Sequence, residues 1–295
     1  MRRHISCSQA IRRVMFGSTV AELPTPLERE WLWAALQTLI DVRGEQTFLA
    51  APIVLPNDEF FPDRWSPDEH GVARLAKRLL GYAGLGHLDV DVEVFTEATE
   101  VREVGLDGRA AATSHAGAAA WFAGIRGGTC LFGAEADQLG DPLGLVGAMA
   151  HEIAHAFRRS HRLEHRDRDL EEKLTDVTTI YLGFGVLTTA ASARFITKHH
   201  DNLGSSYAHK RQGYLAPHEM AFMLASQLQL RGYERDIVRW FAKQVPANQA
   251  ATIRAATIET TRELIANAMG FERVPDPVPP PPIQVKSWWQ RLLGP

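Results

Sequence analysis

The segment from Asp141 to Phe157 constrains the fold of this 295-residue chain more than any other part of the sequence. Asp141 is a strong N-cap residue and Pro142 suits the first helical position, so a helix is predicted to begin here. The continuation, LGLVGAMAHEIAHAF, consists mainly of small and apolar residues. Such a helix is expected to be buried, and the polar side chains within a buried helix need partners.

Two histidines and a glutamate interrupt this apolar helix, in the order His151-Glu152-Ile153-Ala154-His155. Residues four apart lie on the same face of a helix, so both imidazoles can reach one metal ion. Zinc lowers the pKa of a coordinated water to about 7, and a carboxylate beside that water can take its proton. The HExxH pattern therefore predicts a zinc site in which His151 and His155 are ligands and Glu152 is the general base.

A catalytic zinc site needs a third protein ligand, and the segment EKLTD offers Glu172 and Asp176. These acids share a helix face, and Asp176 opens a long apolar stretch where a carboxylate needs a partner. Over about residues 118–195 the chain resembles the gluzincin metallopeptidases, in which HExxH is followed on a second helix by a glutamate ligand and an aspartate four residues later. The resemblance implies Glu172 as the ligand and Asp176 as the carboxylate that orients a ligand imidazole.

Three other residues compete for the position of third ligand. Asp176 can exchange roles with Glu172, since it lies on the same face. His161 stands where the metzincins place a third histidine, but that family has a glycine at the turn where this chain has Arg158, and an arginine is disfavoured at positive φ. Cys130 is loosely similar to the cysteine ligand of peptide deformylases, although a cysteine in a strand is more often a small hydrophobic residue.

A polar segment after the metal motifs, SSYAHKRQGY at 205–214, lies between two predicted helices. Hydrolysis at such a site needs a hydrogen-bond donor for the oxyanion of the tetrahedral intermediate. The candidates are Tyr207, His209, Arg211 and Tyr214. Each of them is also an ordinary residue of a polar loop.

The remaining pattern predicts an α+β fold in which a small mixed sheet packs on the buried helix and most other helices follow it. Valine and acid alternate over residues 89–94, which indicates a strand with one apolar and one acidic face. Two further strands, 118–125 and 129–132, flank an Arg-Gly-Gly hairpin. In zincins the strand before the active-site helix pairs with an extended substrate, so the resemblance implies that one of these two strands receives a peptide.

Helical patterns are predicted elsewhere, at residues 26–43, 67–80, 167–195, 217–230, 234–243 and 246–269. Ser66 is the predicted N-cap of the second of these helices, with Glu69 completing a capping box. Residues 50–67 are rich in Pro, Asp and Phe and are predicted to be irregular. The uncharged run 177–193 approaches the length of a membrane span, but its Thr and Gly content favours a helix buried in the core.

Composition narrows the classes of function and partner. The net charge of −3 leaves no basic surface typical of nucleic-acid binding. Two cysteines cannot form a disulfide framework and fit a reducing compartment. The basic N-terminal segment lacks the continuous apolar stretch of a secretory signal. We therefore expect a cytoplasmic protein with no nucleic-acid or membrane partner.

Three regions follow from these patterns: a helical and irregular region at 1–88, a zincin-like catalytic domain with C-terminal helices at 89–270, and a proline-rich tail at 271–295. Together they predict a zinc metallopeptidase that acts on a peptide or protein. One alternative is a zinc-stabilised binding or scaffold protein without turnover, whose tail docks a protein partner. Another is a zinc hydrolase of non-peptide amides. Glu152 separates the scaffold reading from the other two, since a purely structural site has no use for a base.

Overall fold

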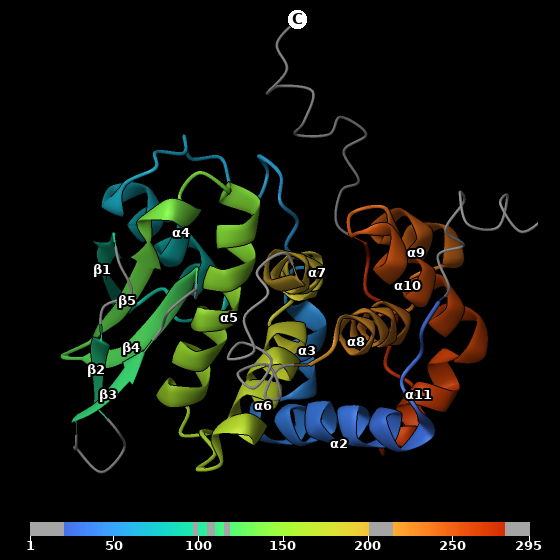
Figure 1. The fold of residues 1–295 in the computed structure, drawn as a ribbon. Coiled ribbons are helices and arrows are strands. Elements are labelled where there is room, and N and C mark those ends of the chain that lie inside the picture. Colours follow the sequence, from blue (N-terminus) through green and yellow to red (C-terminus); the bar gives the residue numbers. More distant parts are fainter. Residues whose placement is uncertain (1–20, 97–99, 105–109, 115–118, 201–214, 281–295) are drawn as a thin grey trace, which may run out of the picture.

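The structure is a computed structural model that describes residues 21–96, 100–104, 110–114, 119–200 and 215–280. It is an α+β fold in which helices predominate, as predicted (Figure 1). Its elements are α2 (Pro26–Arg43), α3 (Glu45–Ala50), α4 (Glu69–Tyr82), β1 (Asp89–Phe95), β2 (Glu100–Val104), β3 (Ala110–Ser114), β4 (Ala120–Arg126), β5 (Thr129–Glu135), α5 (Pro142–Ser160), α6 (Arg168–Tyr181), α7 (Gly185–His200), α8 (Pro217–Leu230), α9 (Arg235–Ala242), α10 (Ala247–Glu259) and α11 (Arg262–Ala268).

The main sheet has the strand order β1-β5-β4. It is mixed, as predicted, because β1 pairs with β5 in parallel and β4 pairs with β5 as an antiparallel hairpin. The central place of β5 corrects one expectation: residues 129–132 have a neighbour on each side and cannot accept a substrate strand, which leaves β4 as the candidate. The hairpin of β2 and β3 was not predicted, and β2 lies beside β4.

Helix α5 begins as the sequence predicts, with the Asp141 carboxylate accepting the Gly144 N–H at 3.2 Å. It packs against β4 on one side and against α6 and α7 on the other. The small residues of its sequence allow this close packing, since a Cβ added at Gly147 would lie 2.3 Å from the Cβ of Ala191 on α7. The polar motif is therefore carried by a helix in the middle of the fold, between the sheet and the later helices (Figure 1).

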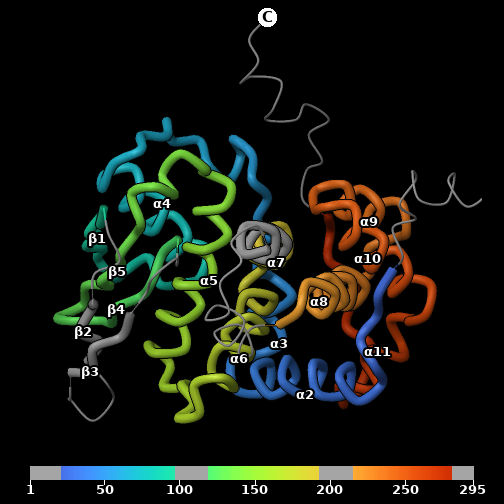
Figure 2. The backbone as a smooth tube through the Cα atoms, in the orientation of Figure 1, coloured from blue at the N-terminus to red at the C-terminus, as the bar shows by residue number. Residues whose placement is uncertain are grey.

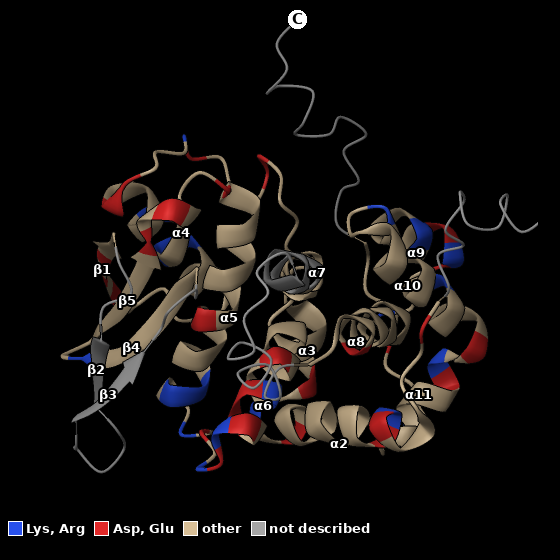
Figure 3. Cartoon of the chain, in the orientation of Figure 1, with Lys and Arg blue, Asp and Glu red and all other residues tan. Residues whose placement is uncertain are grey.

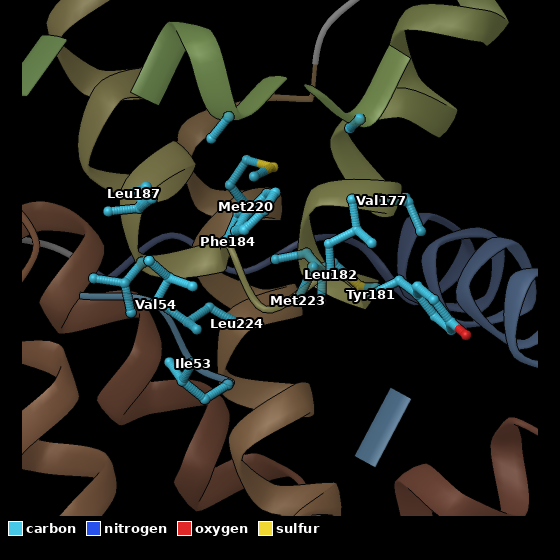
Figure 4. Close-up of a cluster of buried hydrophobic side chains, with 14 of the residues drawn as sticks. Ile53, Val54, Val177, Tyr181, Leu182, Phe184, Leu187, Met220, Met223 and Leu224 are labelled. Carbon is cyan, nitrogen blue, oxygen red and sulfur yellow. The ribbon is translucent and has the colours of Figure 1, made fainter. Parts of the chain in front are cut away.

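Residues 177–189 of the apolar run are buried, as predicted, but the run does not form one helix. Helix α6 ends at Tyr181 and α7 begins at Gly185, because Gly183 adopts a φ of +82°. At this turn the chain meets the irregular segment near Pro52, whose carbonyl oxygen would lie 1.8 Å from a Cβ at Gly183. Side chains from this segment, α6, α7 and α8 form the apolar cluster of Figure 4. Within the described ranges, none of the helices combines the length and apolar character that a bilayer crossing requires.

Two other predicted helix boundaries are wrong for local reasons. The predicted helix 246–269 is divided into α10 and α11 at Thr260, and the next residue, Thr261, caps α11 through its side chain. Helix α4 is capped by Asp68 instead of Ser66, because the Asp68 carboxylate accepts the Gly71 N–H at 2.8 Å. The Ser66 hydroxyl donates a hydrogen bond to the Asp68 carboxylate, so Ser66 supports the N-cap residue but is not itself that residue.

The N-terminal and C-terminal parts of the described chain meet in space. Helix α2 packs against α6 and α8, and its first turns lie beside α11 (Figures 1 and 2). Arg231, at the end of α8, is fully buried and donates to the carbonyls of Phe48 and Ala51 at the end of α3. A cation at the C-terminal end of a helix is favourable, so this arginine joins α8 to the N-terminal region.

The start of the proline-rich tail has no helix or strand, yet it is docked on the body. The Val278 N–H donates to the Arg231 carbonyl at 2.8 Å, and the Arg262 guanidinium donates to the Pro275 carbonyl. Pro275 is buried. The proline-rich sequence of the tail predicts an extended, mobile segment, and this prediction is wrong for residues 275–280. Residues 281–295 lie outside the described part of the chain.

Candidate metal centre

A helical hairpin brings the two predicted metal motifs together. Helix α5 ends at Ser160, the chain reverses through Arg162 at a φ of +56°, and Asp167 caps α6 by accepting the Leu170 N–H at 3.0 Å. The reversal has the hydrogen bonds of a Schellman motif, with the Leu163 N–H donating to the Arg158 carbonyl at 2.8 Å. The carboxylates of α6 thus face the histidines of α5.

Charged residues are concentrated where α5 ends and α6 begins (Figure 3). The buried Arg158 guanidinium donates two hydrogen bonds to the Glu171 carboxylate, at 2.7 and 2.8 Å, and a third to the Leu163 carbonyl at 2.6 Å. The same carboxylate accepts the His165 N–H at 2.6 Å. Because Glu171 immediately precedes Glu172, this bidentate pair also fixes where the predicted ligand stands.

His151, His155 and Glu172 converge, and their ligand atoms all lie within 4.8 Å of one another. The Glu172 Oε2 atom lies 3.2 Å from the Nε2 atom of each imidazole. Zinc binds such atoms at about 2.0–2.1 Å in tetrahedral geometry, so two of its ligands are separated by about 3.3 Å. The observed spacing and the His-His-Glu donor set therefore fit a zinc ion.

Side chains of α6 contact the Nδ1 atoms of both imidazoles. The His151 Nδ1 atom lies 2.8 Å from Asp176 Oδ1, and the other oxygen of Asp176 accepts the Leu215 N–H at 2.9 Å. The His155 Nδ1 atom lies 3.2 Å from the Thr175 hydroxyl. In each ring the Nδ1 atom meets an orienting partner, which directs the Nε2 atom toward Glu172. This is the usual arrangement around metal-binding histidines.

The electrostatics of the cluster favour a cation. Burial raises the pKa of Glu172, but hydrogen bonds from His151 and His155 outweigh burial and hold that pKa well below its usual value. Burial lowers the pKa of His151, yet the Asp176 hydrogen bond and charge bring the net shift to well above the usual value. The carboxylates that favour a proton on His151 also favour a metal ion at the same place.

Glu152 stands beside the cluster and contacts the sheet. Its Oε2 atom accepts the Phe122 N–H of β4 at 2.7 Å. Burial is the main reason that the pKa of Glu152 is raised, with the charges of His155 and His151 acting in the opposite direction. A carboxylate with a raised pKa binds a proton more readily than one in water, which suits it to proton transfer.

The other predicted site residues are placed differently. His161 caps the end of α5, where its Nδ1 atom lies 2.8 Å from the Phe157 carbonyl oxygen and its ring packs 4.2 Å from the Phe157 ring. Cys130 is buried in β5, and burial raises the pKa of its thiol to about 11. Neither belongs to the His-His-Glu group. The predicted oxyanion donors Tyr207, His209 and Tyr214, with Arg211, lie outside the described residues.

Three contributors to the site were not foreseen from the sequence: the Thr175 hydroxyl, the Phe122 N–H and the Arg158–Glu171 pair. Thr175 was within reach of sequence reasoning, because it lies three residues after Glu172 and thus on the same helix face. The backbone contact of Phe122 and the pairing between α5 and α6 depend on the tertiary fold.

Comparison of the chain with protein-family models, with curated proteins and with solved structures found no match. The functional argument therefore depends on the residues of the site and on their geometry.

Proposed function

We propose that this protein is a zinc-dependent hydrolase of the metallopeptidase type, with a zincin-like catalytic region related in its motifs to the gluzincins. The observation that carries the proposal is the convergence of His151, His155 and Glu172 at the spacing of zinc ligands, with Glu152 beside them. The order of the motifs agrees with it, since HExxH lies on α5 and the Glu172-to-Asp176 segment lies on the next helix.

The chain's own residues have distinct roles in this proposal. Zinc supplies Lewis-acid chemistry, polarising a substrate carbonyl and lowering the pKa of water. Glu152 accepts a proton from the attacking water and passes it to the leaving amine. Asp176 orients His151, so that the lone pair of Nε2 is directed to the metal position. The imidazoles and Glu172 would hold the ion.

The strand β4 is the proposed place for the substrate. It is the edge strand of the main sheet on the side of α5, and its Phe122 N–H reaches Glu152. An extended peptide that pairs with this edge is recognised through its backbone. That mode of recognition favours a peptide or protein substrate over a small non-peptide amide.

The first test is the metal content of the purified protein. We expect about one zinc per chain by elemental analysis, and its loss in the His151→Ala/His155→Ala double variant. His161→Ala is the matched control, since this histidine lies at the end of the same helix but outside the cluster. Stoichiometric zinc in the double variant would overturn the proposed site.

The second test separates hydrolysis from a structural role of zinc. Glu152→Gln should retain zinc and fold, because the amide oxygen can still accept the Phe122 N–H, but it cannot take a proton. Hydrolysis of a quenched-fluorescent peptide library should therefore be abolished, while the exposed-residue control Glu69→Gln remains active. Undiminished turnover in Glu152→Gln would refute this base. Zinc binding without turnover in the unaltered protein would favour a zinc-stabilised binding protein.

A further inference from the structure

We propose that Thr175 is a positioning residue of the metal centre, which fixes the ring orientation and the tautomer of His155. The inference rests on the proposed function, because it concerns how one of the proposed ligands is held. Thr175 is fully buried and lies between Glu172 and Asp176 on the inner face of α6. Its Oγ1 atom is 3.2 Å from Nδ1 of His155.

The direction of this hydrogen bond follows from counting protons. A threonine hydroxyl has one proton to donate, and Thr175 donates it to the Glu171 carbonyl one turn earlier, at 2.8 Å. The contact with His155 then forms only if Nδ1–H of the imidazole donates and Oγ1 accepts. Nδ1 of His155 therefore carries a proton, so Nε2, which lies 3.2 Å from Glu172 Oε2, is the nitrogen that can give up its proton and bind a metal ion.

His151 is oriented by the same logic with a different group. The Asp176 carboxylate is an acceptor, so the contact of 2.8 Å assigns the proton of His151 to Nδ1 as well. One turn of α6 thus supplies a ligand, Glu172, and the orienting partners of both histidines. A hydroxyl at Thr175 orients His155 without adding another negative charge beside Glu172 and Asp176.

Thr178 provides a matched control on the same helix. It is also fully buried, and its hydroxyl donates to the backbone carbonyl one turn earlier, that of Leu174, at 2.7 Å. It lies on the side of α6 that faces Arg158, at 3.4 Å from Nη1. Replacing either threonine by valine removes one buried backbone hydrogen bond and keeps the branched shape. Thr178→Val also removes the acceptor of the long Arg158 Nη1 contact but leaves both Arg158–Glu171 bonds, whereas only the change at Thr175 removes the partner of His155.

The test compares metal binding by Thr175→Val, Thr175→Ser and Thr178→Val in the full chain, by competition with a chromogenic zinc chelator. Loss of an orienting partner typically weakens metal affinity about 10–100-fold. We expect that loss for Thr175→Val, rescue to near the unaltered affinity for Thr175→Ser, and no change for Thr178→Val. With Co²⁺ in place of zinc, the visible absorption spectrum should change for Thr175→Val alone, because the ligand geometry is altered.

The outcomes distinguish the inference from the function on which it rests. Unaltered zinc affinity and an unaltered Co²⁺ spectrum in Thr175→Val would overturn the role of Thr175 and leave the metal site intact. An equal loss of affinity in Thr178→Val would also overturn it, since the effect would then come from weakening α6. Failure of the unaltered chain to bind zinc would refute the proposed function itself, and the positioning role with it.

Discussion

Removal of the first part of the proline-rich tail should destabilise the fold, although the sequence predicts a mobile tail that is dispensable for zinc binding. Two truncations test this, one after Val274 and one after Pro280. Both remove 281–295, and only the first also removes the docked residues 275–280. The difference between the two truncated chains therefore measures the docked segment alone.

The size of the effect can be worked out from the contacts. The docked segment makes three hydrogen bonds to the body, through Val278 N–H, the Pro275 carbonyl and the Pro279 carbonyl. At about 1 kcal/mol each these contribute about 3 kcal/mol. The burial of Pro275 and the partial burial of Val278 add about 2 kcal/mol. Ordering the chain costs about 1–2 kcal/mol per residue.

The cost of ordering is small for this segment, because four of the six residues from 275 to 280 are prolines, whose φ is already fixed. If the full entropy cost of ordering applies only to Asp276 and Val278, it amounts to about 3 kcal/mol. The net stabilisation is then about 2 kcal/mol, which corresponds to about 4 °C in melting temperature for a chain of this size.

Differential scanning calorimetry of the two truncated chains at equal concentration is the assay. We expect the chain that ends at Val274 to melt about 4 °C below the chain that ends at Pro280. Both should bind zinc equally at 25 °C, since the tail residues bond to Arg231 and Tyr233 after α8 and to Arg262 of α11, and not to the metal cluster. Equal melting temperatures would show that the docked contacts contribute nothing and that the reasoning is wrong.

Two further predictions concern the order of importance of the candidate zinc ligands and the reactivity of the buried Cys130. Glu172→Ala should lower zinc affinity most, Asp176→Asn should lower it about 10–100-fold, and His161→Ala should hardly change it. Titration with a competing chelator measures the order of the three affinities. A greater loss in Asp176→Asn than in Glu172→Ala would make the aspartate the ligand. In a chain carrying Cys7→Ser, Cys130 should react with a thiol reagent at pH 8 only after unfolding in urea. The reason is that burial raises the pKa of the Cys130 thiol to about 11, which leaves about one thiol in a thousand ionised at pH 8. Rapid labelling of the folded chain would contradict the burial of Cys130.

The elements that were predicted correctly are those with strong local signals. Thr25, Pro26 and Glu28 specify the start of α2 through a complete capping box, and Asp141 specifies the start of α5. The glycines of the β4–β5 turn adopt positive φ, as a tight hairpin requires. Each of these signals acts over a few residues, so no knowledge of the tertiary fold was needed to interpret it.

The break between α6 and α7 and the docking of the tail depend on distant parts of the chain. Nothing local in the apolar run from 177 to 193 shows that the segment at Pro52 and Val54 crosses it, with the Val54 N–H donating to the Gly183 carbonyl at 2.9 Å. Gly183 is a signal for the end of a helix, but a glycine within a buried helix is also common in packed cores. The docking of Val278 on Arg231 was hidden in the same way, since it joins segments far apart in the sequence.

The prediction that His161 lies away from the metal site agrees with the observed geometry, but its physical reason, the steric preference of Arg158, is incomplete. Arg158 was taken to disfavour a turn at positive φ, which would keep His161 away from the metal site. In the structure α5 does continue through Arg158, but the turn follows at Arg162, a non-glycine residue with a φ of +56°. Steric preference therefore did not prevent an arginine from making the turn. At position 158 the bidentate pair with Glu171 joins α5 to α6, and it places the neighbouring Glu172 opposite the histidines.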